Sequence, residues 1–276
     1  MSELEDKEEV QIETPFGSPS ELYVVGVLSG KRVAFLARHG KHHRILPSEL
    51  NFRANIYGFK KLGVTRILSA SAVGSLRSEH KPMDFVLPDQ FVDRTRLRVS
   101  TFFGEGVVAH ISFADPICSQ LADQVETAAG NIELPIKRGG TYVCMEGPAF
   151  STRGESHLYR SWGMDLIGMT NLQEARLARE AEICYVTIAM VTDYDCWHEG
   201  EEDVTVEAII EVLHKNADTA KAIVKKTAAA LPATSSCECL RAAQFAFITQ
   251  PDKMPAGTKA KLDALYGQYW SLDTTS

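Results

Sequence analysis

Stretches of apolar residues at five places in the chain predict β-strands. The most uniform stretch covers residues 183–191, where Thr187 is the one plainly polar side chain. A run without polar alternation is typical of a strand buried on both faces of a parallel sheet. Shorter apolar segments predict further strands at residues 33–37, 66–72, 84–87 and 141–145.

Helical patterns alternate with these strands. A helix is expected to begin near Pro47, with Ser48 as its N-cap, and to end at Gly63. Further helices are expected at residues 173–181, 204–230 and 257–269. The alternation predicts an α/β fold: one domain with a mixed, largely parallel β-sheet flanked by helices.

Composition narrows the class of protein. The 276 residues are 45% hydrophobic and 24% charged, which suits a globular domain with a sizeable core. The net charge of −7, without a basic stripe, argues against nucleic acid as a partner. No apolar run approaches the ~20 residues that span a bilayer, so no membrane partner is expected. The acidic N-terminus does not resemble a signal peptide, and we expect a cytoplasmic protein.

The six cysteines are scattered and show no C-x-x-C spacing, which argues against a structural zinc site. Cys237 and Cys239 form a C-x-C pair that is either redox-active, disulfide-bonded or, as we expect in a cytosolic chain, two free thiols. The histidines at 39, 42 and 43 have no matching carboxylates. The sequence therefore predicts no metal site.

Two carboxylates, Asp193 and Asp195, follow the buried strand directly. In an extended chain their i, i+2 spacing would point both to the same side, and ligands of α/β proteins bind beyond the carboxyl ends of strands. A purine base suits this pair, because a protonated carboxyl donates to ring N7 and a carboxylate accepts from an exocyclic amine. The alternative is a solvated loop in which one Asp caps the next helix.

Three other clusters follow predicted strands. Arg38 and His39 offer donors for a phosphate, or Arg38 simply pairs with a nearby acid. The segment 71–74 offers a hydroxyl and turn amides to an anion, or is only a turn. Glu146 either binds sugar hydroxyls or is a buried carboxylate held by backbone amides.

Several motifs occur in a fixed order along the chain: Leu36-Ala37-Arg38-His39-Gly40, Pro47-Ser48 with Asn51 and Asn55, Ala72-Val73-Gly74-Ser75-Leu76, Asp89-Gln90-Phe91-Val92-Asp93-Arg94-Thr95, Met145-Glu146-Gly147-Pro148-Ala149-Phe150-Ser151-Thr152-Arg153, Gly168-Met169-Thr170 and Thr192-Asp193-Tyr194-Asp195-Cys196-Trp197. Together they resemble the 5′-methylthioadenosine phosphorylases, which belong to the trimeric purine nucleoside phosphorylase family. The resemblance extends from about Thr14 to the C-terminal helix.

The resemblance implies a reaction and its site residues. The reaction is phosphorolysis of 5′-methylthioadenosine to adenine and 5-methylthioribose-1-phosphate in purine and methionine salvage, with inorganic phosphate as co-substrate and no cofactor. Asp193 would be catalytic and protonate N7. The resemblance assigns phosphate binding to Arg38, His39, Ser71, Ala72 and Thr170. It assigns nucleoside binding to Met169 at the ribose, Asp195 at the 6-amino group, Phe150 and Ser151 beside the base, Val206, Ile209 and Ile210 at the methylthio group, and His110 of a neighbouring subunit in a homotrimer or hexamer.

The N-terminus departs from the family pattern. Family members begin with a strand and a Gly-Gly-Ser/Thr-Gly-Leu loop that clasps phosphate, whereas residues 1–12 here are acidic and contain no glycine. We therefore divide the chain into an acidic segment (1–13) and a nucleoside phosphorylase domain (14–276) that lacks this strand and loop. An assigned start at an internal methionine is favoured over a true loss. Three rival activities stay open: a phosphate-independent nucleosidase, a catalytically impaired homologue that binds purine nucleosides, and a histidine phosphatase acting through His39.

Overall fold

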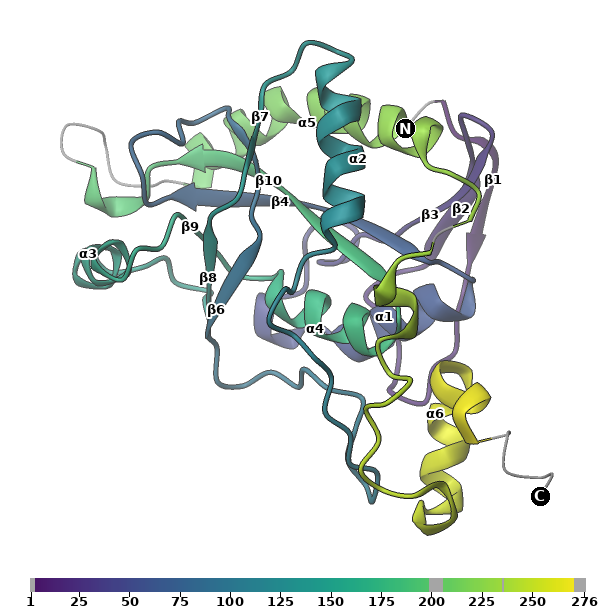
Figure 1. Ribbon diagram of the computed structural model, residues 1–276. Helices are drawn as coiled ribbons and strands as arrows, with labels where there is room; N and C mark the ends of the chain where they lie inside the picture. The colour runs from purple at the N-terminus through teal and green to yellow at the C-terminus, as the bar shows by residue number, and fades with distance from the viewer. Residues whose placement is uncertain (1–2, 199–205, 235, 271–276) are drawn as a thin grey trace.

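The computed structural model describes residues 3–198, 206–234 and 236–270, with only the backbone described for 206–209. Its strands form two sheets (Figure 1). The smaller one is antiparallel and consists of β1 (Glu5–Val10), β2 (Tyr23–Leu28) and β3 (Lys31–Phe35), with β2 in the middle. β1 lies within the acidic segment 1–13 and pairs with β2, and the domain boundary at residue 13 stays a prediction.

The larger sheet has seven strands in the order β6-β8-β9-β4-β10-β5-β7. Their bounds are β4 (Arg66–Ser75), β5 (Phe85–Leu87), β6 (Gln90–Arg94), β7 (Ile136–Arg138), β8 (Thr141–Met145), β9 (Leu166–Gly168) and β10 (Cys184–Asp193). β4 and β10 are parallel at its centre, so that Asp193 ends beside Gly74. Pairing is antiparallel only for β10 with β5 and for β4 with β9, which confirms the mixed, largely parallel sheet.

Helices cover both faces of this sheet. Figure 1 shows α2 and α5 on one face and α1 and α4 on the other, with α3 and α6 at opposite ends of the molecule. The helices are α1 (Phe52–Lys61), α2 (Ser119–Gly130), α3 (Arg153–Ser161), α4 (Leu172–Glu180), α5 (Val206–Ala230) and α6 (Ala256–Trp270), with 3-10 turns η1 (Pro47–Glu49), η2 (Asp195–Trp197), η3 (Glu238–Arg241) and η4 (Pro251–Lys253). No helix in the described part of the chain is long and apolar enough to cross a bilayer.

One helix start was predicted at the wrong place. Ser48 lies inside η1, and α1 begins at Phe52. Its N-cap is Asn51, whose side chain accepts a hydrogen bond from the Ala54 N–H. Asn51 is an N-cap as favourable as Ser48, and Pro47 marks the short 3-10 turn and not the helix.

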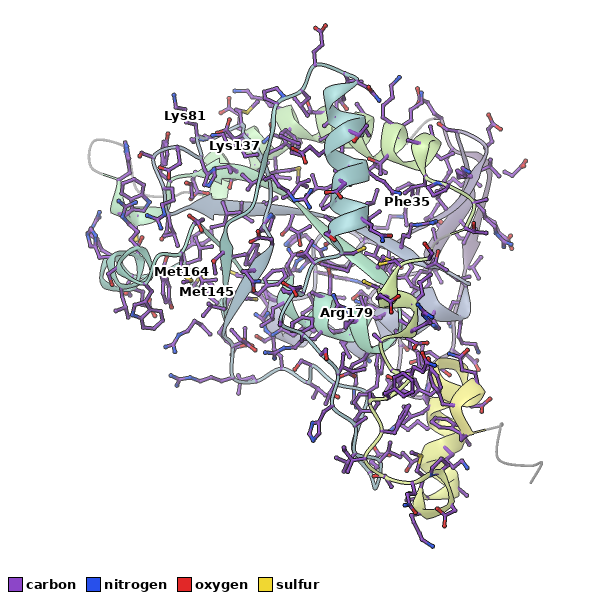
Figure 2. All side chains as sticks on the ribbon, viewed as in Figure 1. Phe35, Lys81, Lys137, Met145, Met164 and Arg179 are labelled. Carbon is purple, nitrogen blue, oxygen red and sulfur yellow. The ribbon has the colours of Figure 1, made fainter. Side chains whose placement is uncertain are left out.

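The core forms around β10, in which every residue except Asp193 is buried. Burial on both faces explains why this strand has no polar alternation. A separate small apolar cluster lies towards α3, where Met145 and Met164 are close neighbours (Figure 2). Packing around β10 fixes where β4 and β10 end, and the two carboxylates Asp193 and Asp195 lie at that end.

Candidate active site

A cavity of about 1380 Å³ runs along β4 and reaches the carboxyl ends of β4 and β10. It extends from Met145 to Phe35, which lie on opposite sides of the view in Figure 2. Most of the residues predicted for the site line this one cavity: Arg38, His39, Ser71, Ala72, Phe150, Ser151, Met169, Thr170, Asp193, Asp195 and Ile210.

Asp193 and Asp195 meet through a turn and not through an extended strand. The backbone of Asp195 lies in the left-handed region at φ 52°, within η2. Its N–H donates to Asp193 Oδ1 at 2.8 Å, and Thr192 Oγ1 donates to Asp193 Oδ2 at 2.6 Å. The prediction of an extended chain at residues 193–195 was therefore wrong. Both carboxylates nevertheless line the same cavity.

The Asp195 carboxylate is oriented by Ser151. The Ser151 hydroxyl lies 2.7 and 2.8 Å from its two oxygens. Gly74 allows the pair to approach the end of β4, since a Cβ at this position would lie 3.0 Å from Asp193 Oδ1 and 3.5 Å from Asp195 Cβ. A larger residue at position 74 would therefore crowd the Asp193 carboxylate.

Arg38 makes a two-point ion pair with Glu174, at 2.6 Å from Nε to Oε1 and 3.0 Å from Nη2 to Oε2. Its Nη2 also donates to Ser69, and Nη1 donates to the Ala70 carbonyl at 3.2 Å. These bonds account for four of the five N–H groups of a guanidinium. Within the described residues one Nη1–H is left for a ligand. The alternative that Arg38 pairs with an acid is therefore confirmed, and the acid is Glu174. Arg38 also lines the cavity.

His39 is fixed beside Arg38. Its Nδ1 lies 2.9 Å from the Ile45 carbonyl, and its ring stacks on His43 with centroids 4.2 Å apart. Burial lowers the pKa of the His39 imidazole, and the neighbouring His43 and Arg38 charges lower it further. A neutral His39 donates from Nδ1 to Ile45, which leaves Nε2 as a hydrogen-bond acceptor for a ligand.

Glu146 is a carboxylate held by the protein itself. It accepts from the Ser48 hydroxyl, from the Leu97 N–H at 3.2 Å and from Arg98 Nε at 3.2 Å. Burial raises the pKa of this carboxyl, but these hydrogen bonds outweigh burial and hold it below the usual value. Glu146 does not line the cavity. The structure therefore favours a carboxylate held by the protein over one that binds sugar hydroxyls.

Sequence reasoning missed two residues that shape the site. Glu174 lies on α4, far along the chain from Arg38, and no local spacing connects the two. Arg98, whose side chain is fully buried, donates to the carbonyls of Met145, Glu146 and Met169 and so joins two site segments. A buried arginine needs hydrogen-bond acceptors, and the sequence does not show which carbonyls would supply them.

Three predicted residues are not placed in the cavity. His110 is exposed and lies outside the lining; its N–H donates to the Ala246 carbonyl at 2.9 Å. Val206 and Ile209 belong to α5, but their side chains lie outside the described residues. Ile210, from the same helix face, does line the cavity.

A cavity lined by two carboxylates and an arginine, at the central strand ends of an α/β sheet, is the kind of site at which α/β enzymes bind small substrates. The family model of the phosphorylase superfamily matches residues 2–229 of this sequence. The chain therefore belongs to the phosphorylase superfamily, and the resemblance stated from its motifs is confirmed.

Curated relatives and solved structures support the same family assignment. The chain is 60% identical over 270 residues to the S-methyl-5′-thioadenosine phosphorylase of Koribacter versatilis (strain Ellin345), covering 98% of this chain and 92% of that protein. A methylthioadenosine phosphorylase from an Antarctic soil metagenomic library superposes with a TM-score of 0.92 at 50% identity, covering 96% and 94% of the two chains. The Schistosoma mansoni methylthioadenosine phosphorylase, solved in complex with adenine, has a TM-score of 0.82 at 36% identity, covering 86% and 89%.

Proposed function

We propose that the chain is a pentosyltransferase that cleaves 5′-methylthioadenosine with phosphate, giving adenine and 5-methylthioribose-1-phosphate for purine and methionine salvage. The observation that carries this proposal is a single cavity lined by Asp193 and Asp195 together with Arg38. The names of the curated relatives at up to 60% identity support the same reaction.

Asp193 is the proposed catalytic acid. Adenine leaves poorly as an anion, so N7 must gain a proton or a strong hydrogen bond as the glycosidic bond breaks. The Thr192 hydroxyl lies 2.6 Å from Asp193 Oδ2 and 3.2 Å from the Val73 carbonyl. It can donate to an ionised Asp193, or donate to Val73 instead, in which case the Oδ2–H of a protonated Asp193 can be directed at N7. Both protonation states that the reaction requires therefore fit the same geometry.

Base selection is proposed to depend on Asp195. Held by Ser151, its carboxylate would accept a hydrogen bond from the 6-amino group of adenine. Phe150 and Ser151 would flank the base, and Met169 would contact the ribose. Ile210, with Val206 and Ile209 on the same helix, would receive the methylthio group.

Phosphate is proposed to bind beneath the sugar, where it is both nucleophile and counter-charge to a cation-like ribosyl group. The proposed ligands come from the end of β4, from the segment after β3 and from the start of α4. They are Arg38, His39, Ser71, the amide of Ala72, and Thr170. Phosphate is the co-substrate, and the proposed chemistry uses no metal or other cofactor.

A homotrimer or a hexamer in the cytoplasm is the proposed state of the enzyme. His110 is exposed beside three strongly exposed apolar residues, Val108, Phe245 and Ile248, with exposed fractions of 48%, 92% and 66%. Backbone hydrogen bonds from Ile248 to Val108 and from His110 to Ala246 hold these residues side by side. An exposed apolar patch of this kind suits a subunit interface, across which His110 would reach the neighbouring site.

The test is adenine release from 5′-methylthioadenosine by the purified chain, with and without phosphate. Release that requires phosphate and yields 5-methylthioribose-1-phosphate is expected. Release without phosphate would identify a nucleosidase. Nucleoside binding without any turnover would identify a catalytically impaired homologue.

A further inference from the structure

Four buried cysteines gather at the end of the sheet away from Asp193 and Asp195. They are Cys118, Cys184, Cys237 and Cys239, and their four sulfur atoms all lie within 4.8 Å of one another. Cys184 begins β10, and Asp193 ends it nine residues later, so the two ends are about 30 Å apart at about 3.3 Å per residue. The proposed phosphorolysis leaves this cluster without a role.

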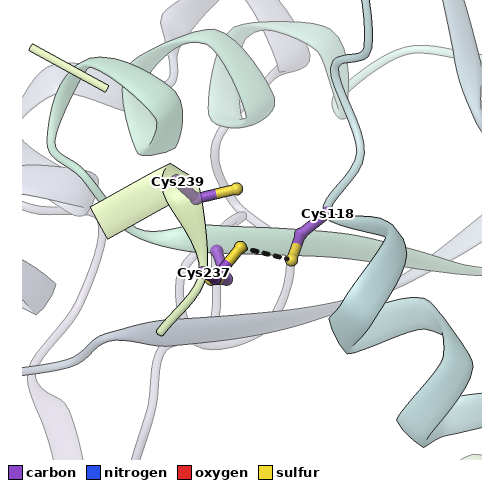
Figure 3. A group of neighbouring side chains, drawn as sticks. Cys118, Cys237 and Cys239 are labelled. Carbon is purple, nitrogen blue, oxygen red and sulfur yellow. Dashed lines mark hydrogen bonds between the residues drawn. The ribbon is translucent and has the colours of Figure 1, made fainter. Parts of the chain in front are cut away.

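Three separate segments supply the cysteines, and each is fixed by backbone contacts. Cys118 precedes α2, and its N–H donates to the Tyr185 carbonyl of β10 at 3.0 Å. The N–H of Cys184 donates to the Thr65 carbonyl at 3.0 Å, at the start of β4. Cys237 and Cys239 belong to the η3 turn, and Figure 3 shows both facing Cys118. The sulfurs therefore converge from rigid positions.

The sulfur spacing is that of a tetrahedral metal site. Four thiolates bound to Zn²⁺ at about 2.3 Å place their sulfurs about 3.8 Å apart. Here Cys118 Sγ and Cys237 Sγ are 3.4 Å apart, and no pair exceeds 4.8 Å. Thiolates are soft ligands that favour Zn²⁺ over Mg²⁺ or Ca²⁺, and four of them leave no open position for catalysis.

Cys118 also lies at a helix N-terminus. Its sulfur is the N-cap of α2 and accepts from the Leu121 N–H at 3.4 Å. A helix N-terminus stabilises negative charge, and N–H···S bonds orient metal-bound sulfur.

We propose that Cys118, Cys184, Cys237 and Cys239 form a closed structural zinc site. The metal joins the start of α2, the start of β10 and the η3 turn, and so fastens the region 236–270 to the central sheet. The ligands come from distant parts of the chain, which is why a search for C-x-x-C spacing argued against zinc.

The first test is the metal content of the full-length chain, purified under reducing conditions, by mass spectrometry of the elements. We expect about one zinc ion per chain. Replacement by Co²⁺ should give the charge-transfer and visible bands of tetrahedral tetrathiolate cobalt. Removal of the metal by a chelator should lower Tm on the order of 10 °C.

Variants assign the ligands. Cys118→Ser and Cys239→Ser should each lose the zinc and the cobalt spectrum, whereas Cys144→Ser, which changes a buried cysteine of β8 outside the cluster, should keep both. The wild-type chain needs no variant to fold, so its cobalt spectrum decides the question alone. Four free thiols that take up neither metal, or disulfides within the cluster in reduced preparations, would overturn the proposal.

Discussion

Each carboxylate in the candidate site has its own partner, and the partner sets what that carboxylate can do. Asp195 accepts from Ser151, so its oxygens are aimed and remain acceptors. Asp193 lies against the Thr192 hydroxyl, which can act as donor or acceptor. Two aspartates separated by one residue therefore suit different tasks: Asp195 accepts from an amine and Asp193 donates a proton.

Asp193→Ala should reduce kcat by roughly 10²–10⁴ with little change in KM for the nucleoside, because it removes protonation of the leaving group. Asp193→Asn should move the preference from adenosine-type towards inosine-type substrates, since the amide NH2 of Asn can donate to N7 and to the O6 acceptor of a 6-oxopurine. Asp252→Ala, on the exposed η4 turn, is the control. Steady-state kinetics with both nucleosides measures these changes. An unchanged kcat for Asp193→Ala would contradict the assignment of Asp193 as the proton donor to N7.

Arg38→Ala should raise the phosphate concentration needed for half-saturation by roughly tenfold to a hundredfold, the loss expected for one charge-assisted hydrogen bond. Nucleoside affinity should change little. Arg44→Ala, an exposed arginine nearby in the chain, is the matched control. Phosphate saturation curves give the answer, and identical curves for wild type and Arg38→Ala would mean that Arg38 serves only Glu174.

At the scale of elements, α4 supports the site and also carries a buried acid. Glu174 at its start pairs with Arg38, and Glu180 at its end accepts from the Phe102 N–H at 2.7 Å. Burial raises the pKa of Glu180 to about 7, from an ordinary value of 4.5. The folded state therefore holds an extra proton between pH 4.5 and 7.

Glu180→Gln should change how stability depends on pH. In the wild type the folded pKa lies above the unfolded one, so the free energy of unfolding falls as pH rises from 4.5 to 7. The substitution removes this loss, which is worth about 3 kcal/mol at most. Denaturant unfolding at pH 5 and pH 8 measures it, with exposed Glu211→Gln as control. Parallel pH curves for Glu180→Gln and wild type would contradict the prediction.

Some elements could be predicted from the pattern of residues and others could not. β10 and β8 were found because burial on both faces leaves an apolar run. β1 is almost entirely charged and exposed, and only pairing with β2 makes it a strand. In the site, the motifs named the residues of the cavity, but Glu174 and the turn at Asp195 depend on long-range contacts that no window of sequence contains.

At the scale of the whole molecule, assembly is the next consequence to test. Phe245→Asp should reduce an assembly of three or six chains of 30.4 kDa to monomers, because a charge would be buried in an apolar interface. Leu158→Asp on α3, at the far end of the molecule from α6 in Figure 1, is the control. Light scattering after size exclusion gives the masses. A monomeric wild type would contradict the proposed interface.

The two sheets share no hydrogen-bonded strand pair among the described residues. Arg38 follows the small sheet and is bonded to Ala70 of β4 and to Glu174 of α4, so its guanidinium is held by the same elements that carry the rest of the cavity. The distance between Arg38 and the carboxylates at the end of β10 is therefore set by the large sheet and α4. Phosphate at Arg38 and nucleoside at the two aspartates would share this fixed frame, and any coupling between their affinities is the same factor in both directions.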